Sequence, residues 1–383
     1  MREMKDSGIE WIGAIPTTWH TKKMKYISNF IQNKYSSDYG LLPYIGLENI
    51  ASWSGSFIST NSQYDREQSL ICEPEDILFG KLRPYLAKVY MNDRLCCCSN
   101  EFAVIRVNGQ NKRYIWYQLL SHGFIFEIDR STYGTKMPRA NAEFIRNVFV
   151  ALPSEIEQQK IANYLDKMCA EIDAVLEKTR ASIEEYKKLK QAVITQAVTK
   201  GIFDKQIYPH NVKLKYLLYI ASGDAIRNEE LSEVGKYPAY GGGESLGFAS
   251  KYNTLENSLI VGRVGARCGC VTYIDSKAWA TDNALIVHPI CNPRYMYYML
   301  IYSQLNNLNT SNAQPLITAT KIKNVVVPYF LEDICQKKIV DFLDEKCACI
   351  DAIIEKKQQY LTEIENYKKS LIYEYVTGKK EVV

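Results

Sequence analysis

The chain has 383 residues, which suggests two or three domains, and 46% of them are hydrophobic, which is ample for buried cores. No apolar run reaches the roughly eighteen residues of a membrane helix, and the start MREMKDSGIEW is too polar for a signal peptide, so we expect neither. The net charge of +4 permits nucleic-acid binding without requiring it, and the eleven cysteines predict free thiols in a reducing cytoplasm.

The first region, residues 1–152, has an α+β pattern. Near its start it contains KDSGIEWIGAIPTTW, residues 5–19, which has turn residues at Gly8, Gly13 and Pro16. We expect its two tryptophans, Trp11 and Trp19, to be buried. Short apolar runs separated by turn residues predict strands between residues 44 and 107. Three segments are expected to follow: a short helix at 113–129, a polar loop at 131–142 and a strand at 145–152.

A long helix is predicted for residues 153–201. Neither proline nor glycine occurs between Pro153 and Gly201, and the apolar residues between them recur at spacings of three and four. This pattern is typical of an amphipathic helix with one apolar seam. If Leu165 occupies heptad position a, then Met168, Ile172 and Val175 also lie on the seam.

The same stretch occurs a second time towards the end of the chain. When Gln158 is laid on Gln336, the two stretches match without a gap, for example at Leu165/Leu343, Cys169/Cys347 and Ile172/Ile350. A second long helix is therefore predicted for residues 331–383. Because an amphipathic helix of this length needs a partner, we expect an intramolecular antiparallel coiled coil that returns the C-terminus to the first region. Two separate surface helices on unrelated domains are the alternative.

The second region, residues 202–330, repeats the order of the first with weak identity. The matching segments are KMKY at 23–26 with KLKY at 213–216, ILFGKLR at 77–83 with LIVGRVG at 259–265, and RYIWYQLL at 113–120 with RYMYYMLI at 294–301. We therefore predict an α+β fold in which two similar α/β domains are separated by two long helices forming an antiparallel coiled coil, with a pseudo-twofold internal repeat. A shared scaffold with divergent loops is typical of two recognition modules for different targets.

We find no catalytic or metal-binding constellation in the sequence. Neighbouring residues of an extended strand point to opposite faces, so Cys96, Cys97 and Cys98 are poorly placed to chelate zinc, and buried thiols are the simpler interpretation.

Two further motifs are weak. The glycine-rich stretch at 241–247 lacks the spacing of a dinucleotide-binding loop, which favours a turn over a phosphate site. Glu73, Glu75 and Asp76 precede Lys81 in an order that faintly suggests a nuclease, but the stretch is too short to carry that interpretation.

The residues best suited to binding are cations and tyrosines in or beside loops that contain glycine or proline. Lysine and arginine supply phosphate contacts, and arginine can also pair with guanine edges. The candidate DNA-binding residues are Lys81, Arg83, Tyr133, Lys136 and Arg139 in the first region, and Tyr240, Arg263, Arg267, Lys321 and Lys323 in the second. A solvated surface charge is the plainer interpretation of any single member, and the group carries more weight.

These features together resemble the specificity subunit of type I restriction–modification systems. The resemblance covers nearly the whole chain and is carried by KDSGIEWIGAIPTTW, by the junction VFVALPSEIEQQKIANYLD and by its weaker copy VVVPYFLEDICQKKIVDFLD. The first junction contains the pattern PxxxEQxxI, which begins at Pro153. In the second copy, Leu331 and Cys335 stand in place of the proline and the glutamate.

The resemblance implies two target-recognition domains, residues 1–152 and 202–330, each of which reads one half of a bipartite, asymmetric site in double-stranded DNA. It also implies two methyltransferase subunits on this chain, with restriction motor-nuclease subunits joining them. S-adenosylmethionine, ATP and magnesium would belong to those partners, so we expect this chain to be non-catalytic and to hold no cofactor. A coiled-coil adaptor with two peptide-binding domains, and a stand-alone nuclease or methyltransferase, are the alternatives.

Six carboxylates recur at matching positions of the two predicted helices. They are Asp166, Asp173 and Glu177 in the first helix and Asp344, Asp351 and Glu355 in the second. With Leu165 at position a, these residues fall at positions b and f and should point away from the seam. We predict that they present the same acidic surface to two identical methyltransferase subunits. Helix solubility combined with common ancestry of the two halves is the other explanation.

Overall fold

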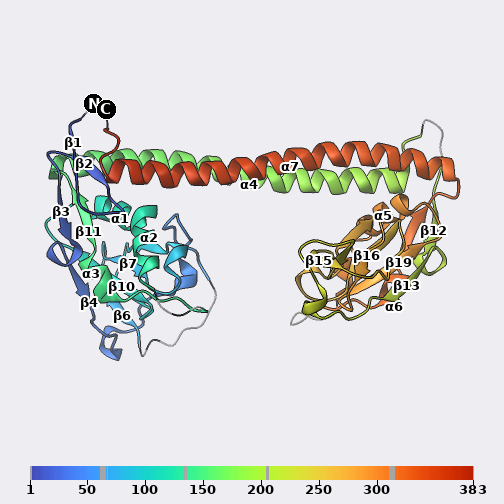
Figure 1. Cartoon of the computed structure of the whole chain (residues 1–383), viewed down its shortest axis with the longest axis horizontal. Coiled ribbons are helices and arrows are strands. Elements are labelled where there is room, and N and C mark those ends of the chain that lie inside the picture. Colours follow the sequence, from blue (N-terminus) through green and yellow to red (C-terminus); the bar gives the residue numbers. More distant parts are fainter. Residues whose placement is uncertain are drawn as a thin grey trace. The chain divides into compact units, whose positions relative to one another are not determined.

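The computed structural model describes residues 2–60, 66, 68–132, 134, 136–203, 207–309 and 315–382. It divides into two compact units: unit 1 comprises residues 1–179 and 360–383, and unit 2 comprises residues 180–359. Each unit therefore contains one α+β region and a segment of each of two long helices, α4 (Glu155–Lys200) and α7 (Asp333–Val376) (Figure 1).

Unit 1 is built on a four-stranded antiparallel sheet in the order β4-β10-β7-β8, beside a smaller sheet in the order β5-β9-β6. Its described strands are β1 (Met4–Asp6), β2 (Ala14–Pro16), β3 (His20–Lys23), β4 (Ser28–Ile31), β5 (Tyr44–Ile45), β6 (Leu70–Cys72), β7 (Ile77–Gly80), β8 (Val89–Met91), β9 (Cys96–Cys98), β10 (Phe102–Val107) and β11 (Phe149–Leu152). Its shorter helices are α1 (Lys112–Leu120), α2 (His122–Arg130) and α3 (Ala142–Asn147), and its 3-10 turns are η1 (Met24–Tyr26), η2 (Ser37–Tyr39), η3 (Leu47–Asn49) and η4 (Pro84–Leu86).

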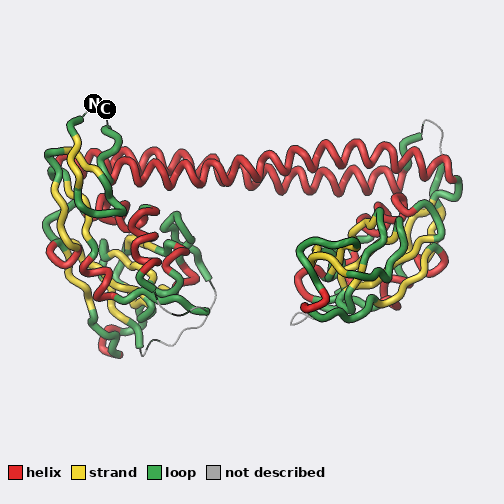
Figure 2. Tube along the Cα trace, viewed as in Figure 1, coloured by secondary structure: helices red, strands yellow, loops and turns green. Residues whose placement is uncertain are grey.

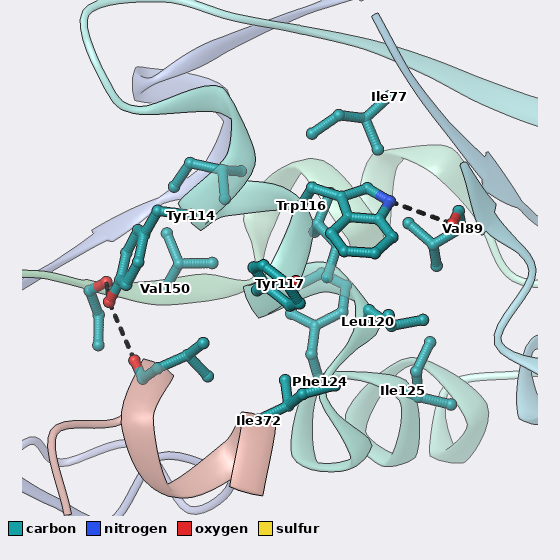
Figure 3. Packing of buried hydrophobic residues seen from close by; sticks show 14 of the residues in the cluster. Ile77, Val89, Tyr114, Trp116, Tyr117, Leu120, Phe124, Ile125, Val150 and Ile372 are labelled. Carbon is teal, nitrogen blue, oxygen red and sulfur yellow. Dashed lines mark hydrogen bonds between the residues drawn. The ribbon is translucent and has the colours of Figure 1, made fainter. Parts of the chain in front are cut away.

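The core of unit 1 joins the central sheet to α1, α2 and the long helices (Figure 3). The indole nitrogen of Trp116 donates to the carbonyl of Val89 at 3.1 Å, which ties α1 to β8. The buried hydroxyl of Tyr114 lies 2.9 Å from the carbonyl of Ala151 and 3.0 Å from that of Val376, so it joins α1 to β11 and to the end of α7. Buried hydroxyls need such partners, because an unmet hydrogen bond is costly there.

The C-terminal residues pack on the N-terminal segment within unit 1. The ammonium group of Lys379 donates to the carbonyls of Ile12 and Ala14, each at 2.7 Å, and burial lowers the pKa of this lysine. The tryptophans of the N-terminal segment, Trp11 and Trp19, are both buried. The predicted return of the chain end to the first region is confirmed, as is the burial of both tryptophans.

Residues 113–129 form two helices where we expected one. Ser121 is extended, with φ −64° and ψ 144°, and its hydroxyl accepts a hydrogen bond from the amide of Phe124 as the N-cap of α2. Gly123 then packs so closely that a Cβ there would lie 2.9 Å from ring atoms of Trp11 and Tyr373. The break therefore depends on tertiary packing. The expected strand at 145–152 is likewise shorter, because α3 occupies its first residues and β11 begins at Phe149.

Unit 2 repeats this architecture, with a central antiparallel sheet in the order β13-β19-β16-β17 and a smaller sheet in the order β15-β14-β18. Its described strands are β12 (His210–Lys213), β13 (Leu218–Ser222), β14 (Tyr237–Tyr240), β15 (Ser245–Ala249), β16 (Ser258–Gly262), β17 (Val271–Ile274), β18 (Trp279–Ala280), β19 (Ala284–Pro289) and β20 (Val326–Tyr329). Its helices are α5 (Pro293–Tyr302) and α6 (Ala319–Lys323), and its 3-10 turns are η5 (Leu214–Tyr216), η6 (Asn228–Glu230), η7 (Gly265–Arg267) and η8 (Leu305–Leu308). In both units, loops and turns join short strands (Figure 2).

The two long helices pair in an antiparallel manner in each unit. In unit 1, the ring of Tyr164 lies 4.6 Å from that of Tyr375, and further along α4 Asp173 meets Lys368 of α7. Rising numbers on one helix thus meet falling numbers on the other. Unit 2 shows the same order, where the ammonium group of Lys357 lies 5.6 Å from the ring of Tyr186 and Lys190 meets Asp351. The antiparallel coiled coil predicted from the repeat is therefore confirmed.

The register of the seam differs from the heptad we assigned. Val175 is 39% exposed, whereas its neighbour Leu176 is 4% exposed, and the buried positions of α4 in unit 1 include Leu165, Cys169 and Ile172. An α-helix has 3.6 residues per turn, so a strict 3.5-residue repeat drifts around its surface. The seam moves accordingly, and the core of unit 1 packs against the same helix.

Within the described residues, no helix is both long and apolar enough to cross a lipid bilayer.

Candidate nucleic-acid interface

Four candidate cations of unit 1 lie on two chain segments that pair with one another. The segment after β7 carries Lys81 and Arg83, and its partner carries Lys136 and Arg139. The amide of Arg83 donates to the carbonyl of Pro138 at 2.8 Å. Residues 82 and 139 also form an antiparallel bridge. The fold thus brings together cations that are far apart in the sequence.

In unit 2, the segment after β16 likewise pairs with a distant segment, and we call this pairing the crossing of each unit. The carbonyl of Arg263 accepts from the amide of Ile317 at 2.9 Å, and the amide of Arg263 donates to the carbonyl of Asn283 at 2.9 Å. In unit 1, the amide of Lys81 donates to the carbonyl of Glu101 at 2.9 Å in the equivalent way. Lys81 and Arg263 therefore occupy the same point of the scaffold, and a cation stands there in both units.

The side chains at the crossing in unit 1 differ in their surroundings. Lys81 is half-buried, and this burial lowers the pKa of its ammonium group. Arg83 is exposed and has a left-handed φ of 51°, a conformation that residues other than glycine rarely adopt. Lys136 is exposed, and Tyr133 lies outside the described residues. The structure thus holds Arg83 outward in a strained backbone, as functional sites often do.

Two of the candidate arginines are paired with carboxylates that the sequence analysis missed. Arg139 forms an ion pair with Glu101, and Arg267 forms one with Glu244, whose hydrogen bond raises the pKa of Arg267. Glu244 lies in the turn between β14 and β15. Single loop carboxylates carry no periodicity or spacing signal, so their pairing with these arginines could be found only in the folded chain.

The remaining candidates of unit 2 lie on β14 and α6. Tyr240 is half-buried on β14, and burial raises the pKa of its hydroxyl. Lys321 and Lys323 lie in the last turn of α6. The ammonium group of Lys321 donates to the carbonyl of Leu308 at 3.2 Å. Tyr240 and Lys321 are thus partly engaged by the chain itself.

Asp166 and Asp344, two of the recurring carboxylates, connect the long helices to the α+β regions. Asp166 accepts hydrogen bonds from Arg113 Nε at 2.6 Å and from the Tyr117 hydroxyl at 2.7 Å. The copy in unit 2 is the same: Asp344 accepts from Arg294 Nη2 at 2.6 Å and from the hydroxyl of Tyr298. We call each group of three an Arg-Tyr-Asp knot. It gives an intrachain reason for the repetition of these carboxylates.

Asp173 and Asp351 pair across the coiled coil. Asp173 lies 2.7 Å from the ammonium group of Lys368, and Asp351 lies 2.6 Å from that of Lys190. Lys190 and Lys368 are themselves equivalent under the repeat, so one ion pair occurs twice with the helices exchanged. The prediction that these two aspartates point away from the partner helix is wrong, because a lysine on that helix attracts each of them. Their role in binding a partner subunit stays a prediction.

The remaining repeated carboxylates, Glu177 and Glu355, are both exposed. Their positions agree with either a solvated face or a docking surface, so their predicted role also stays untested.

The cysteines of β9 are buried thiols, and two of them, Cys96 and Cys98, belong to a small apolar cluster. Cys96, Cys97 and Cys98 have no exposed surface, and Cys72 Sγ of the paired strand β6 lies 3.1 Å from Cys96 Sγ. Burial raises the pKa of Cys97. Among the described residues, no three histidine, cysteine or carboxylate side chains are grouped as metal ligands.

The two weak motifs have structural explanations. Asp76 is buried and forms a bidentate ion pair with Arg106, with N–O distances of 2.8 and 2.9 Å. Its carboxylate also accepts a hydrogen bond from the amide of Glu73. Its carboxylate is thus committed to the fold. The glycine-rich stretch at 241–247 turns the chain between the antiparallel strands β14 and β15, with the amide of Gly241 donating to the carbonyl of Glu244.

Comparison with known proteins places the chain in one family. The model of the type I restriction modification DNA specificity domain matches it twice, at residues 16–185 and 210–365. The specificity subunit of the type I restriction enzyme MjaVIII from Methanocaldococcus jannaschii is 24% identical over 327 residues, which cover 73% of each chain. That of EcoprrI from Escherichia coli is 28% identical over 137 residues, or 35% of this chain and 34% of the relative.

A solved structure shares the fold. It is described as the structural basis of complex assembly and conformational transition of the type I R-M system, and it aligns with a TM-score of 0.74 at 16% identity, over 96% of this chain and 99% of that one. Both halves of the chain thus carry the domain that the family model describes, on the scaffold that this structure has. The chain belongs to the family of type I restriction–modification DNA specificity subunits.

Proposed function

We propose that this chain selects the DNA target of a type I restriction–modification complex, with residues 1–152 and 202–330 as two target-recognition domains. Each domain reads one half of a bipartite, asymmetric site in double-stranded DNA. The long helices, residues 153–201 and 331–383, connect the domains and set the spacing of the half-sites. No feature of the described residues favours the peptide-binding adaptor over this function.

The proposal rests on the equivalent backbone pairing of two segments, the one after β7 in unit 1 and the one after β16 in unit 2. The same backbone hydrogen bonds place Lys81 in unit 1 and Arg263 in unit 2 at one point of a shared scaffold. Lysine and arginine are cationic side chains that contact phosphates, and arginine can also read guanine. The loops around this point differ between the units, as two half-sites of different sequence require.

The proposal extends to the partners of the family. Two methyltransferase subunits bind this chain, and restriction motor-nuclease subunits join them in the cytoplasm. Those subunits hold S-adenosylmethionine, ATP and magnesium and carry out the chemistry. The exposed Glu177 and Glu355 are the part of the acidic set most available to the methyltransferase subunits, because the four aspartates have partners within the chain.

The test is to sequence the methylated sites in cells that carry this chain together with its partner subunits. We expect one bipartite motif for the wild-type chain. Lys81→Ala should alter modification through one half-site and Arg263→Ala through the other, each at a cost of about 1–3 kcal/mol if the side chain reads a base. Lys178→Ala on the exposed face of α4 is the matched control. Absence of any motif, or equal loss at both half-sites from either variant, would contradict the assignment.

A further inference from the structure

The segment that leads into each central sheet ends in the same lysine and tyrosine in both units, although the buried residue before them differs. It reads HTKKMKY at 20–26 in unit 1 and HNVKLKY at 210–216 in unit 2. The fully buried residue is Met24 in one and Leu214 in the other. Core positions are normally the more constrained, because packing restricts them, so surface identity between two halves this divergent calls for another cause.

In the 3-10 turns η1 and η5, the lysine and the tyrosine after the buried residue are identical. Of the four residues before the buried one, only the histidine and the last lysine also match between the two segments. Tyr26 is 71% exposed and Tyr216 is 65% exposed, which is unusual for large aromatic side chains. The ammonium group of Lys25 lies 5.3 Å from the ring centre of Tyr26, and that of Lys215 lies 4.7 Å from the ring centre of Tyr216. Each turn thus presents a cation and a phenol hydroxyl side by side.

The backbone holds the two turns in the same way. The amide of Met24 donates to the carbonyl of Val148 at 3.0 Å, and that of Leu214 donates to Val325 at 2.9 Å. At the other end of each turn, the carbonyls of residues 27 and 217 accept from the amides of residues 108 and 290, both at 2.8 Å. The lysine and tyrosine are therefore presented on rigid, equivalent supports.

Each turn packs beside a short helix that adds another cation. Helix α3 contacts η1 and carries Arg146 in its last turn, and α6 contacts η5 and carries Lys323 at the matching position. In unit 1, Arg146 and Lys81 line a common groove of about 270 Å³. The turn therefore adjoins the candidate nucleic-acid interface through α3, whose Glu143 lines the same groove and lies 3.5 Å from Arg146.

Under the proposed function, on which this inference rests, the two domains read different base sequences. A lysine–tyrosine pair that is the same in both domains should then contact a feature that the two half-sites share. The phosphodiester backbone is such a feature, and its negative charge is complementary to the lysine. We propose that Lys25 with Tyr26, and Lys215 with Tyr216, are sequence-independent phosphate anchors. The ammonium group neutralises a phosphate, and the tyrosine hydroxyl donates a hydrogen bond to a phosphate oxygen.

The anchors can be tested by the salt dependence of binding to a short duplex of arbitrary sequence. Each phosphate contact adds roughly 0.9 to the slope of log affinity against log salt. The full chain with Lys25→Ala and Lys215→Ala should lose about 2 from this slope and bind roughly 30-fold more weakly at about 0.15 M salt. Lys178→Ala with Lys356→Ala, a second pair of repeated exposed lysines, is the matched control and should leave the slope unchanged.

Conservative variants separate charge from fold. Lys25→Arg with Lys215→Arg keeps both charges and should restore the slope, and Tyr26→Phe with Tyr216→Phe keeps the rings and should weaken binding without changing the slope. All variants should keep the wild-type unfolding temperature, because three of the four residues are exposed and the fourth, Lys25, is only partly buried. The set of methylated sequences should also be unchanged in the lysine-to-alanine pair, since phosphates carry no base information.

Three outcomes overturn the anchors. An unchanged slope in the alanine pair excludes phosphate contacts, and weaker binding of methyltransferase subunits with an unchanged slope identifies a protein-docking surface instead. A change in the methylated motif would make these residues base readers. Failure of the proposed function looks different: the wild-type chain would then direct no motif at all, while the slope of the alanine pair could still fall.

Discussion

The two units share one scaffold and differ in how a strand is added to it. Both have the same four-stranded sheet, and in both the smaller sheet contains one parallel pair, β5 with β9 or β14 with β18. The third strand joins opposite members of this pair: β6 pairs with β9 in unit 1, whereas β15 pairs with β14 in unit 2. The main core is kept and the smaller sheet is rearranged.

The difference shows which parts of the fold are constrained by the long helices. The main core of each unit includes residues of α4 and α7, so its shape must fit them. Among the described residues, those of the smaller sheets belong to separate clusters. These clusters include central-sheet residues such as Leu78 and Ile260, but no residue of α4 or α7. A separate cluster can be repacked without disturbing the helix contacts, which leaves this part of each domain open to a new target specificity.

The largest expected effect comes from the shared helix positions. Leu165 and Leu343 are equivalent and fully buried, one in each core. Changing either to alanine should lower the free energy of unfolding of its own unit by about 2–5 kcal/mol, because a cavity replaces a buried side chain. Hydrogen exchange of peptides from each unit measures this. Val175→Ala, at an exposed position, is the control, and equal loss of protection in both units from one variant would show that the cores are not separate.

A smaller effect on stability is expected at a closely packed glycine of unit 1. Gly123 packs against Trp11 and Tyr373 in unit 1, where an added Cβ would lie 2.9 Å from ring atoms. Gly123→Ala should destabilise unit 1 by about 1–3 kcal/mol through overpacking. A Cβ at Gly242 of unit 2 would be 3.4 Å from its nearest neighbours, an ordinary contact, so Gly242→Ala is the matched control in the same thermal unfolding experiment. Equal effects of the two variants would mean that helix α2 tolerates a side chain at this site.

The smallest expected effect comes from the Arg-Tyr-Asp knots, which should contribute equally to the stability of the two units. Asp166→Asn and Asp344→Asn remove the charge from the Arg-Tyr-Asp knots while keeping an acceptor for the tyrosine. Because these ion pairs are more than a third exposed, each change should cost only about 1 kcal/mol. Denaturant unfolding checks this, with Glu177→Gln as the control. A cost in one unit alone would show that the two knots are not equivalent.

The sequence by itself determined the long helices and their pairing. Each amphipathic pattern is unbroken and longer than a typical helix of a globular protein, so the helix needs a partner for its apolar face. The repeat provides that partner, so both α4 and α7 could be predicted from the sequence pattern alone. It also located Lys81 and Arg263 at equivalent positions, because the strands before them align.

Tertiary structure decided what the polar faces meet. Periodicity identifies which face of a helix is apolar, but it does not show which charged side chains of other elements lie beside a carboxylate. It therefore gave no sign of Arg113 beside Asp166 or of Lys368 beside Asp173. The break at Ser121 also depended on distant chain segments, since Gly123 must fit against Trp11 and Tyr373. Long-range packing and charge pairing act between residues far apart in the sequence, and only the folded chain brings them together.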